Sequence, residues 1–319
     1  MRVQKQFCVI MVMMGLLIGV LSMSDTIDIR AVEKNASDKA ALKQLIKKQQ
    51  KAKAKVPGNI NASCYTWNKN GRLSGIEWSE RKIKGTLSLS EFPALEDVRL
   101  DYNHLTGLDI SQNAKLTVLY CDHNKLTDLN VNQNSALKEL DCTVNQLKEL
   151  DVSTNSALKS LCCSNNQLTD LDVSKNKALK ELECSWNKLA ALDITMLPKL
   201  KELECAHNQL TSIDVSRNQE LDWLDCDLNQ LAVLDVHQNK KLRVLSSNGN
   251  KLTNIDVRKN KKLEVLECTD NQLAKLDVRQ NCLLEELWCT NNKIKRLNLK
   301  KNTALYRLEC DKKVKVSGF

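Results

Sequence analysis

The stretch LKELDCTVNQLKELDVSTNSA occupies residues 137–157, and LKSLCCSNNQLTDLDVSKNKA follows directly at residues 158–178. Both fit one 21-residue unit, L-x-x-L-x-C-x-x-N-x-L-x-x-L-D-V-S-x-N-x-x, and ten such units fill residues 95–304 without an insertion. A unit of this length cannot bury an apolar face by itself, so it must stack on its neighbours. The sequence therefore predicts a solenoid, which is a binding scaffold before anything else.

Two residue types recur in the unit at fixed places. Cysteine returns every 21 residues, except that Ser247 holds one of the positions: Cys121, Cys142, Cys163, Cys184, Cys205, Cys226, Cys268, Cys289 and Cys310. Asparagine returns three residues after the same position in each unit: Asn103, Asn124, Asn145, Asn166, Asn187, Asn208, Asn229, Asn250, Asn271 and Asn292. Buried amides cannot stay without hydrogen bonds, so we expect each asparagine to bond backbone groups where the chain leaves a strand.

The segment L-x-x-L-x-C alternates inward and outward as a β-strand does, which places leucine and cysteine in the core. The second half of the unit is too short and too β-branched for a useful helix, and its Asp and Asn suit tight turns. Residues 179–199 depart from the pattern with Leu197-Pro198, so we expect a different turn there.

The cysteine series predicts buried thiols rather than disulfides. Cysteines 21 residues apart fall on adjacent parallel strands, ~4.8 Å apart and pointing the same way. Parallel Cβ vectors do not give the dihedral that a disulfide requires, and the same geometry argues against zinc. Cys64, Cys162 and Cys282 lie outside the series, and Cys162 is expected to be exposed and reactive.

The N-terminal part of the chain predicts export. Residues 1–24 carry Arg2 and Lys5, then an apolar run of 15 residues at 7–21, then the small residues Ser22 and Ser24. This is the pattern of a signal peptide, and the run is short for a membrane span of ~20 residues. The alternative is an uncleaved anchor. We expect a secreted or cell-surface protein.

Residues 25–58 are expected to form a linker and a basic helix. The helix is predicted over 36–55, capped by Asn35 or Ser37, with Leu42, Leu45 and Ile46 on one face and Pro57 ending it. Most of the net charge of +9 lies before residue 56, and the repeats are close to neutral. The lysines of the helix predict a solvated face. The alternative is contact with anionic lipid or nucleic acid.

The two ends of the array differ from its middle. Residues 59–94 are predicted to be an N-terminal cap with a first degenerate repeat, in which Trp78 takes the cysteine position and helps to cover the open end of the stack. Residues 305–319 are predicted to close the other end as a strand that includes Val314 and Val316.

The repeats over residues 73–310 resemble leucine-rich repeats, and their 21-residue, cysteine-bearing form resembles bacterial surface proteins of the internalin J type. This resemblance implies a right-handed, curved solenoid with a parallel β-sheet on its concave side. It also implies that the concave side binds proteins, as is common in that family.

Acidic residues greatly outnumber basic ones at the outward strand positions. Of the 33 positions in the concave strands, 15 hold Asp or Glu and two hold Arg. The densest group is Glu181, Glu183, Glu202, Glu204, Asp225 and Asp227, and the aromatic residues on or beside this face are Trp223, Trp288, Trp186 and Tyr120. Tryptophan beside charge is typical of protein-binding hot spots, although flanking lysines could neutralise such a group.

We therefore predict a monomeric binding protein whose partner is a protein with basic segments. The alternative is carbohydrate, with Trp223, Trp288 and Tyr120 stacking on sugar rings, and a structural role in the cell envelope comes third. Nucleic acid is not expected because the face has the wrong sign. Calcium bridging between strands stays an open alternative, although no loop has ligand spacing.

No enzyme activity and no cofactor are predicted. The four histidines, His104, His123, His207 and His237, share no local motif with a nucleophile. The sequence also lacks a glycine-rich phosphate loop, a GxSxG motif and an HExxH motif.

Overall fold

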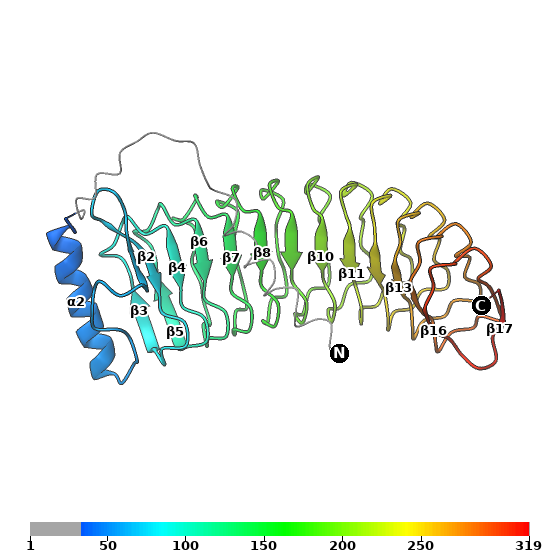
Figure 1. Cartoon of the computed structure of the whole chain (residues 1–319), viewed down its shortest axis with the longest axis horizontal. Coiled ribbons are helices and arrows are strands. Elements are labelled where there is room, and N and C mark those ends of the chain that lie inside the picture. Colours follow the sequence, from blue (N-terminus) through cyan, green and yellow to red (C-terminus); the bar gives the residue numbers. More distant parts are fainter. Residues whose placement is uncertain (1–32, 319) are drawn as a thin grey trace. The chain divides into compact units, whose positions relative to one another are not determined.

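In each repeat the residues expected to face inward are buried. Leu137, Leu140, Cys142, Leu147 and Val152 of one repeat are at most 1% exposed, and the equivalent residues of the other repeats form one continuous core with them. The computed structural model describes residues 33–318. Within them the chain forms the predicted leucine-rich-repeat solenoid, with a parallel sheet on the concave side and a single N-terminal helix (Figure 1). The predicted signal peptide lies outside the described residues.

The concave sheet has 13 strands, and all neighbours after the first pair are parallel and in register. The strands are, in order, β1 (Tyr65–Trp67), β2 (Leu73–Glu77), β4 (Asp97–Arg99), β6 (Val118–Tyr120), β7 (Glu139–Asp141), β8 (Ser160–Cys162), β9 (Glu181–Glu183), β10 (Glu202–Glu204), β11 (Trp223–Asp225), β12 (Val244–Ser246), β13 (Val265–Glu267), β14 (Glu286–Trp288) and β16 (Arg307–Glu309). Equal repeat length keeps the register constant, so each side chain lies beside its equivalent in the next repeat.

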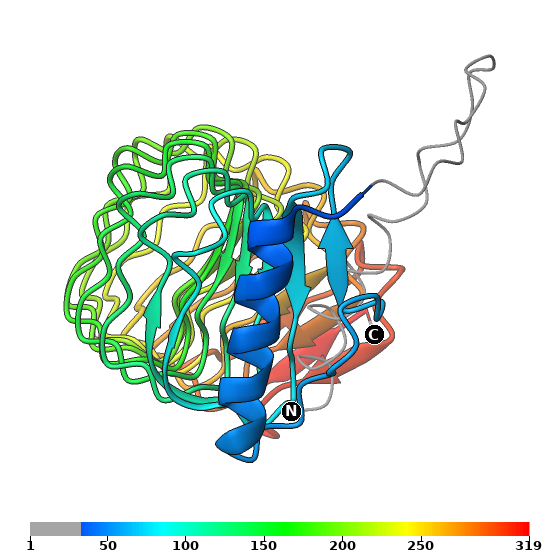
Figure 2. The same ribbon diagram turned by 90° about the vertical axis from the view of Figure 1, so that its left-hand side faces the viewer.

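Helix α2 (Ala36–Lys51) lies across the N-terminal end of the stack (Figures 1 and 2). Asn35 is the N-cap, because its side chain accepts a hydrogen bond from the Asp38 backbone N–H at 3.1 Å. Leu42 and Ile46 are buried in the core, and Leu45 packs against it. The Asp38 carboxylate, which is 1% exposed, accepts hydrogen bonds from Arg72 Nε at 2.8 Å and from the Leu73 backbone N–H at 2.9 Å.

The helix is shorter than the predicted 36–55. It ends at Lys51, and Lys53 has a positive φ of 65°. The turn brings Ala54 and Val56 into the core, which a continued helix could not do, so packing stops the helix before Pro57. The side chains of Lys43, Lys47 and Lys48 are exposed, as a solvated helix face requires.

Trp78 fills the cysteine position of the first repeat and is completely buried. Its Nε1 donates a hydrogen bond to the Tyr65 hydroxyl at 3.1 Å, and that hydroxyl donates to the Pro57 carbonyl at 2.8 Å. The two rings meet edge-on, with centroids 6.2 Å apart. The aromatic pair therefore packs beneath α2, which itself covers the end.

The convex side is built from turns, with short sheets only near the two ends. β3 (Lys84–Ser88) pairs with β5 (His104–Asp109), and β15 (Arg296–Asn298) pairs with β17 (Lys315–Ser317). The predicted closing segment is thus divided: β16 extends the concave sheet, whereas β17 joins the convex side.

Two rows of buried asparagines hold the repeats together. In the first row, Asn145 Nδ2 donates to the carbonyls of Cys121 and Cys142, both at 3.0 Å, and its Oδ1 accepts from the Leu126 N–H at 2.9 Å. In the second row, on the convex side, Asn155 Nδ2 donates to the carbonyls of Val131 and Asn134. The first-row amide therefore bonds its own repeat and the preceding one, whereas the second-row amide donates only to the preceding repeat.

The expectation of a different turn at Leu197-Pro198 is wrong. The Leu197 N–H donates to the Ile194 carbonyl at 3.0 Å, just as the Asn176 N–H donates to the Val173 carbonyl at 3.0 Å one repeat earlier. Leu197 takes an asparagine position of the second row and is completely buried. The backbone keeps its course because the inward leucine packs in the same place, and only the side-chain amide is lost.

Candidate interaction surface

Three neighbouring strands carry the six carboxylates predicted as the densest acidic group. In the register of the sheet, Glu181 of β9 lies beside Glu202 of β10, and Glu183 lies beside Glu204. Glu204 in turn lies beside Asp225 of β11, and Asp227 follows two residues later. We call Glu181, Glu183, Glu202, Glu204, Asp225 and Asp227 the acidic patch. Like charges opposite one another destabilise a sheet, so this arrangement has a cost that must be offset elsewhere.

Flanking lysines form no ion pairs with the carboxylates of the acidic patch within the described residues. Among the described residues, no Lys, Arg or His nitrogen lies within 4.0 Å of any of its carboxylates, although acidic residues elsewhere are ion-paired. Arg243, for example, pairs with Asp222 at 2.8 Å and with Glu264 at 3.3 Å. The nearby Lys180 and Lys201 are exposed, one position before each strand. Among the described residues, the six carboxylates of the acidic patch therefore form no ion pair.

Burial and mutual repulsion raise the pKa values of the patch. Burial first, and repulsion from Glu204 second, raise the pKa of Glu183 to about 8. Burial and repulsion from Asp227 raise the pKa of Asp225 to about 8 as well. The pKa values of Glu202 and Glu204 are also raised, chiefly by burial. Near neutral pH the patch therefore holds protons that an approaching cation would displace.

Asp227 belongs to a polar network at the edge of the patch. It accepts hydrogen bonds from Ser246 Oγ at 2.7 Å and from the Asn248 backbone N–H at 2.6 Å. Asn248 Nδ2 also donates to Glu267 at 2.9 Å. These hydrogen bonds hold the carboxylate in place without supplying a positive charge.

A second acidic group surrounds a histidine nearer the N-terminal end. His123 Nδ1 lies 2.8 Å from an Asp122 carboxylate oxygen. Burial, followed by repulsion from Asp141, raises the pKa of Asp122 to about 6. This group pairs a carboxylate directly with a histidine ring, a contact that no carboxylate of the acidic patch makes among the described residues.

Two of the predicted aromatic anchors have a ring face covered by arginine. The Arg99 guanidinium lies 4.6 Å from the Tyr120 ring centroid, and the Tyr120 hydroxyl donates to Glu139 at 2.6 Å. The Arg307 guanidinium lies 3.9 Å from the Trp288 ring centroid. Trp223 is half-buried, in register with Glu202. These rings are therefore less available for stacking than the sequence suggested.

Trp186 is the most exposed of the predicted aromatic residues. It is 54% exposed, and one face of its ring stacks on His207 with centroids 3.4 Å apart and 15° between the planes. It directly follows the end of β9 and thus adjoins the acidic patch. His207, which follows β10, was not predicted as a site residue.

The prediction that Cys162 is exposed is wrong. Cys162 is only 6% exposed. It lies between Asp141 and Glu183 in the register of the sheet, and these larger side chains cover it. Its Sγ and one carboxylate oxygen each of Glu181 and Glu183 lie within 4.8 Å of one another. Sulfur with two carboxylates suits zinc better than calcium, which prefers oxygen ligands alone.

Eight of the nine ladder cysteines are buried, and Cys310 is partly exposed. Burial raises the pKa of the Cys184 thiol to about 12, so it stays protonated. Cys205 Sγ donates to the Asp225 carbonyl at 3.4 Å, and Cys226 Sγ donates to the Ser246 carbonyl at 3.3 Å. These cysteines are structural.

Sequence reasoning missed one row of residues. The residue before each first-row asparagine has a left-handed backbone, with φ between 50° and 63°: Tyr102, His123, Val144, Asn165, Trp186, His207, Leu228, Gly249, Asp270 and Asn291. Large side chains are unusual at positive φ, yet Tyr102, Trp186 and Leu228 are 52%, 54% and 48% exposed. The sequence signal for this row was that Tyr102, Trp186 and Leu228 stand at a repeat position where other repeats have Asn, Gly or Asp.

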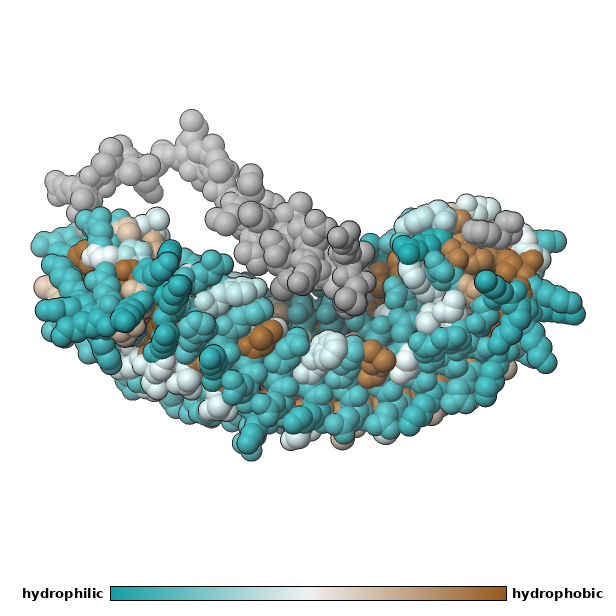
Figure 3. Space-filling view, turned by 90° about the horizontal axis from the view of Figure 1, so that it is seen from below, coloured by the Kyte–Doolittle hydropathy of each residue, from teal (hydrophilic) through white to brown (hydrophobic). Residues whose placement is uncertain are grey.

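This row follows the carboxyl ends of the concave strands, the edge to which the arrowheads in Figure 1 point. Figure 3 views that edge and shows a hydrophilic surface interrupted by separate hydrophobic patches. We call Trp186, His207 and Leu228, which follow β9, β10 and β11, the rim. The rim and the acidic patch belong to the same three repeats.

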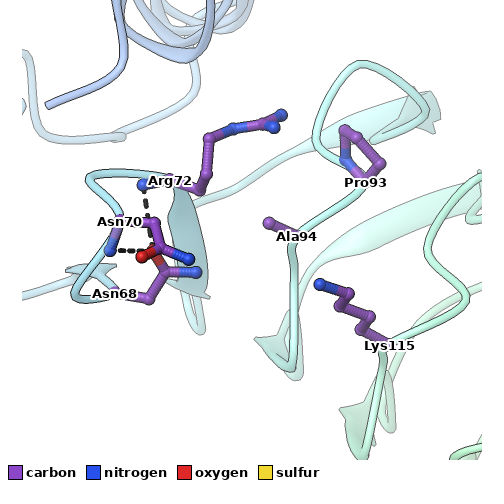
Figure 4. A pocket seen from close by; sticks show the side chains of 6 residues that line it. All are labelled: Asn68, Asn70, Arg72, Pro93, Ala94 and Lys115. Atoms are coloured by element: carbon purple, nitrogen blue, oxygen red, sulfur yellow. Dashed lines mark hydrogen bonds between the residues drawn. The ribbon is translucent and has the colours of Figure 1, made fainter.

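A pocket of about 450 Å³ lies away from this surface (Figure 4). Its lining residues are Asn68, Asn70, Arg72, Pro93, Ala94 and Lys115. Arg72 is engaged by Asp38, and Asn68 Oδ1 accepts from the backbone of Asn70 and Arg72. Lys115 and Arg72 are the ionisable side chains of its lining. Among residues 33–318, no helix is long and apolar enough to cross a membrane.

Comparison with known proteins agrees with this geometry. The functional domain of InlJ from Listeria monocytogenes, which includes a cysteine ladder, is 38% identical, covers 75% of this chain with 54% of its own length, and has a TM-score of 0.74. A leucine-rich-repeat protein from Leptospira interrogans is 26% identical, with 75% and 72% coverage and a TM-score of 0.62. The leucine-rich-repeat domain of APL1B shares the fold at 22% identity, with a TM-score of 0.63.

No family model and no curated protein matches the sequence. The chain spans about half the length of the InlJ domain that it matches, so only the repeats can be compared. They share the fold and a cysteine ladder. The chain is a leucine-rich-repeat protein with a cysteine ladder of the internalin J type.

Proposed function

We propose that the protein is an exported interaction module that binds a protein with basic segments through its acidic patch. A leucine-rich-repeat scaffold of the internalin kind serves protein interaction in general, and the neighbours that share the fold are interaction or receptor proteins rather than enzymes. The observation that carries the proposal is the absence, among the described residues, of any ion pair to the six carboxylates.

Electrostatics supports a cationic partner. A concave surface of one sign concentrates ligands of the opposite sign and raises their association rate. A basic segment would also relieve repulsion within the patch and displace protons from Glu183 and Asp225, whose pKa values are raised. Nucleic acid would meet repulsion here.

Carbohydrate binding at the predicted aromatic residues has less support. A sugar ring needs an open aromatic face, and arginine covers one face of Tyr120 and of Trp288. We therefore keep carbohydrate as an outcome of the test. Secretion or display at the cell surface is part of the proposal and rests on the N-terminal sequence pattern.

The test is a capture experiment with the natural chain and a neutralised variant. In the variant, the four glutamates of the patch are changed to Gln and Asp225 and Asp227 to Asn. We expect the natural chain to capture a protein with basic segments, the variant to lose it, and the interaction to weaken steeply as salt rises. Equal capture by both chains, or binding that is insensitive to salt, would contradict the proposal and favour glycan or apolar contacts.

A further inference from the structure

The rim has a left-handed backbone, and two of its side chains, Trp186 and Leu228, are exposed. Trp186, His207 and Leu228 have φ values of 57°, 53° and 50°. Bulky side chains rarely occupy this region, because Cβ approaches the carbonyl oxygen. Four of the seven equivalent positions in other repeats hold Asn165, Gly249, Asp270 and Asn291, which belong to the residue types that tolerate it. The other three hold Tyr102, His123 and Val144.

Burial in the fold does not explain these side chains. Trp186 and Leu228 are 54% and 48% exposed, so they contribute little apolar burial in return for the strain. The stack with His207 covers one face of the Trp186 ring and leaves the rest in solvent. Strained positions that persist without a structural gain are typical of binding sites.

The rim lies directly beside the acidic patch. His207 N–H donates to the Asp227 carbonyl at 2.8 Å, and the Trp186 N–H donates to the Ala206 carbonyl at 2.9 Å. The residues directly before Trp186 and His207 are the small Ser185 and Ala206, which are 7% and 4% exposed. Three consecutive repeats thus present carboxylates on the sheet and an aromatic and aliphatic edge next to them.

We propose that the rim binds the apolar side chains of a basic, amphipathic polypeptide segment whose cationic side chains lie on the acidic patch. This inference rests on the proposed function and deepens it, because it states the chemistry of the partner. The negative charges of the acidic patch attract the cationic side chains of such a segment. The exposed Trp186 and Leu228 contact its apolar side chains. Aromatic anchors next to charge account for most of the binding energy in many interfaces.

The test uses two synthetic peptides of equal charge, a lysine homopeptide and an amphipathic lysine–leucine peptide, titrated against the full chain. The variant carries Trp186→Asn and Leu228→Asn, because asparagine already holds this position at Asn165 and Asn291. The control is Tyr102→Asn. Tyr102 has the same position, 52% exposure and a stack on His123, but the acidic residues nearby are partnered by Arg99 and His123.

The natural chain should bind the amphipathic peptide at least about tenfold more tightly than the homopeptide. The double variant should lose this preference, keep its affinity for the homopeptide, and melt no lower than the natural chain because the strain is relieved. The control should behave like the natural chain. If the preference for the amphipathic peptide survives in the double variant, or is absent from the natural chain, the proposed binding of apolar side chains by the rim is overturned. If neither peptide binds the natural chain, the acidic patch fails as well.

Discussion

At the scale of single residues, Ser247 shows what the ladder position requires. Ser247 is completely buried, and its Oγ donates to the Glu267 carbonyl at 3.3 Å. Cys226, one repeat earlier, makes the equivalent bond from sulfur to the Ser246 carbonyl, also at 3.3 Å. At these two positions a small buried side chain donates to a carbonyl of the next repeat, whereas the first repeats fill the same position with Trp78 and Leu100.

We expect Ser247→Cys to raise the free energy of unfolding by up to about 1 kcal/mol, because a thiol is less costly to bury than a hydroxyl. Cys226→Ser is the reciprocal change and should lower it by a similar amount. Denaturant midpoints under reducing conditions measure both. A lower midpoint for Ser247→Cys would show that the hydroxyl matters more than apolar burial.

At the scale of the repeat, the two asparagine rows differ in what they supply. First-row Asn145 uses both ends of its amide, since Nδ2 donates and Oδ1 accepts. Second-row Asn155 donates twice, but its Oδ1 finds no donor among the described residues. The natural exception, Leu197, occurs in the second row, where less is lost.

Asn145→Leu should therefore destabilise the protein more than Asn155→Leu. Asn145→Leu leaves buried backbone groups of two repeats without hydrogen-bond partners, at about 1–3 kcal/mol each. Asn155→Leu removes two donated hydrogen bonds, but it also removes an amide oxygen that has no donor. We expect the loss at Asn155 to be no more than about half of that at Asn145. Thermal or denaturant unfolding of the two variants measures the difference, and equal losses would refute this account of the rows.

At the scale of the whole molecule, ionisation of the acidic patch lowers the stability of the fold and provides the charge that binds a basic partner. The raised pKa values of Glu183 and Asp225, about 8 against ordinary values of 4.5 and 3.8, mean that folding favours the protonated forms. Their contribution to stability is complete below about pH 4 and is lost as the pH rises through about 8. The same ionisation creates the charge that a basic partner needs.

From pH 6 to pH 9 we therefore expect the free energy of unfolding to fall while the affinity for the lysine homopeptide rises. Melting curves and titrations at constant ionic strength measure the two trends. In the variant Glu183→Gln/Asp225→Asn, both trends should flatten. If stability and affinity changed in the same direction in the natural chain, ionisation of the patch would not be their common cause.

Much of the fold could be predicted from the sequence, because every repeat applies the same local rules. Inward leucines, the cysteine row and the first asparagine row depend only on position within the unit, and stacking then multiplies them. The predicted end of α2 and the turn at Leu197 were wrong, because packing of Ala54, Val56 and Leu197 against the core outweighs local signals.

The sequence by itself determined the solenoid, its ladder and the alignment of six carboxylates on one face, since all three follow from the 21-residue period. Only the tertiary structure decided how those side chains meet their neighbours. It left the acidic patch without ion pairs, buried Cys162, laid Arg99 and Arg307 over aromatic rings, and set Trp186 at a positive φ beside His207. The reason is physical: periodicity fixes the position of each Cα, whereas pairing and exposure depend on side chains that reach across adjacent repeats.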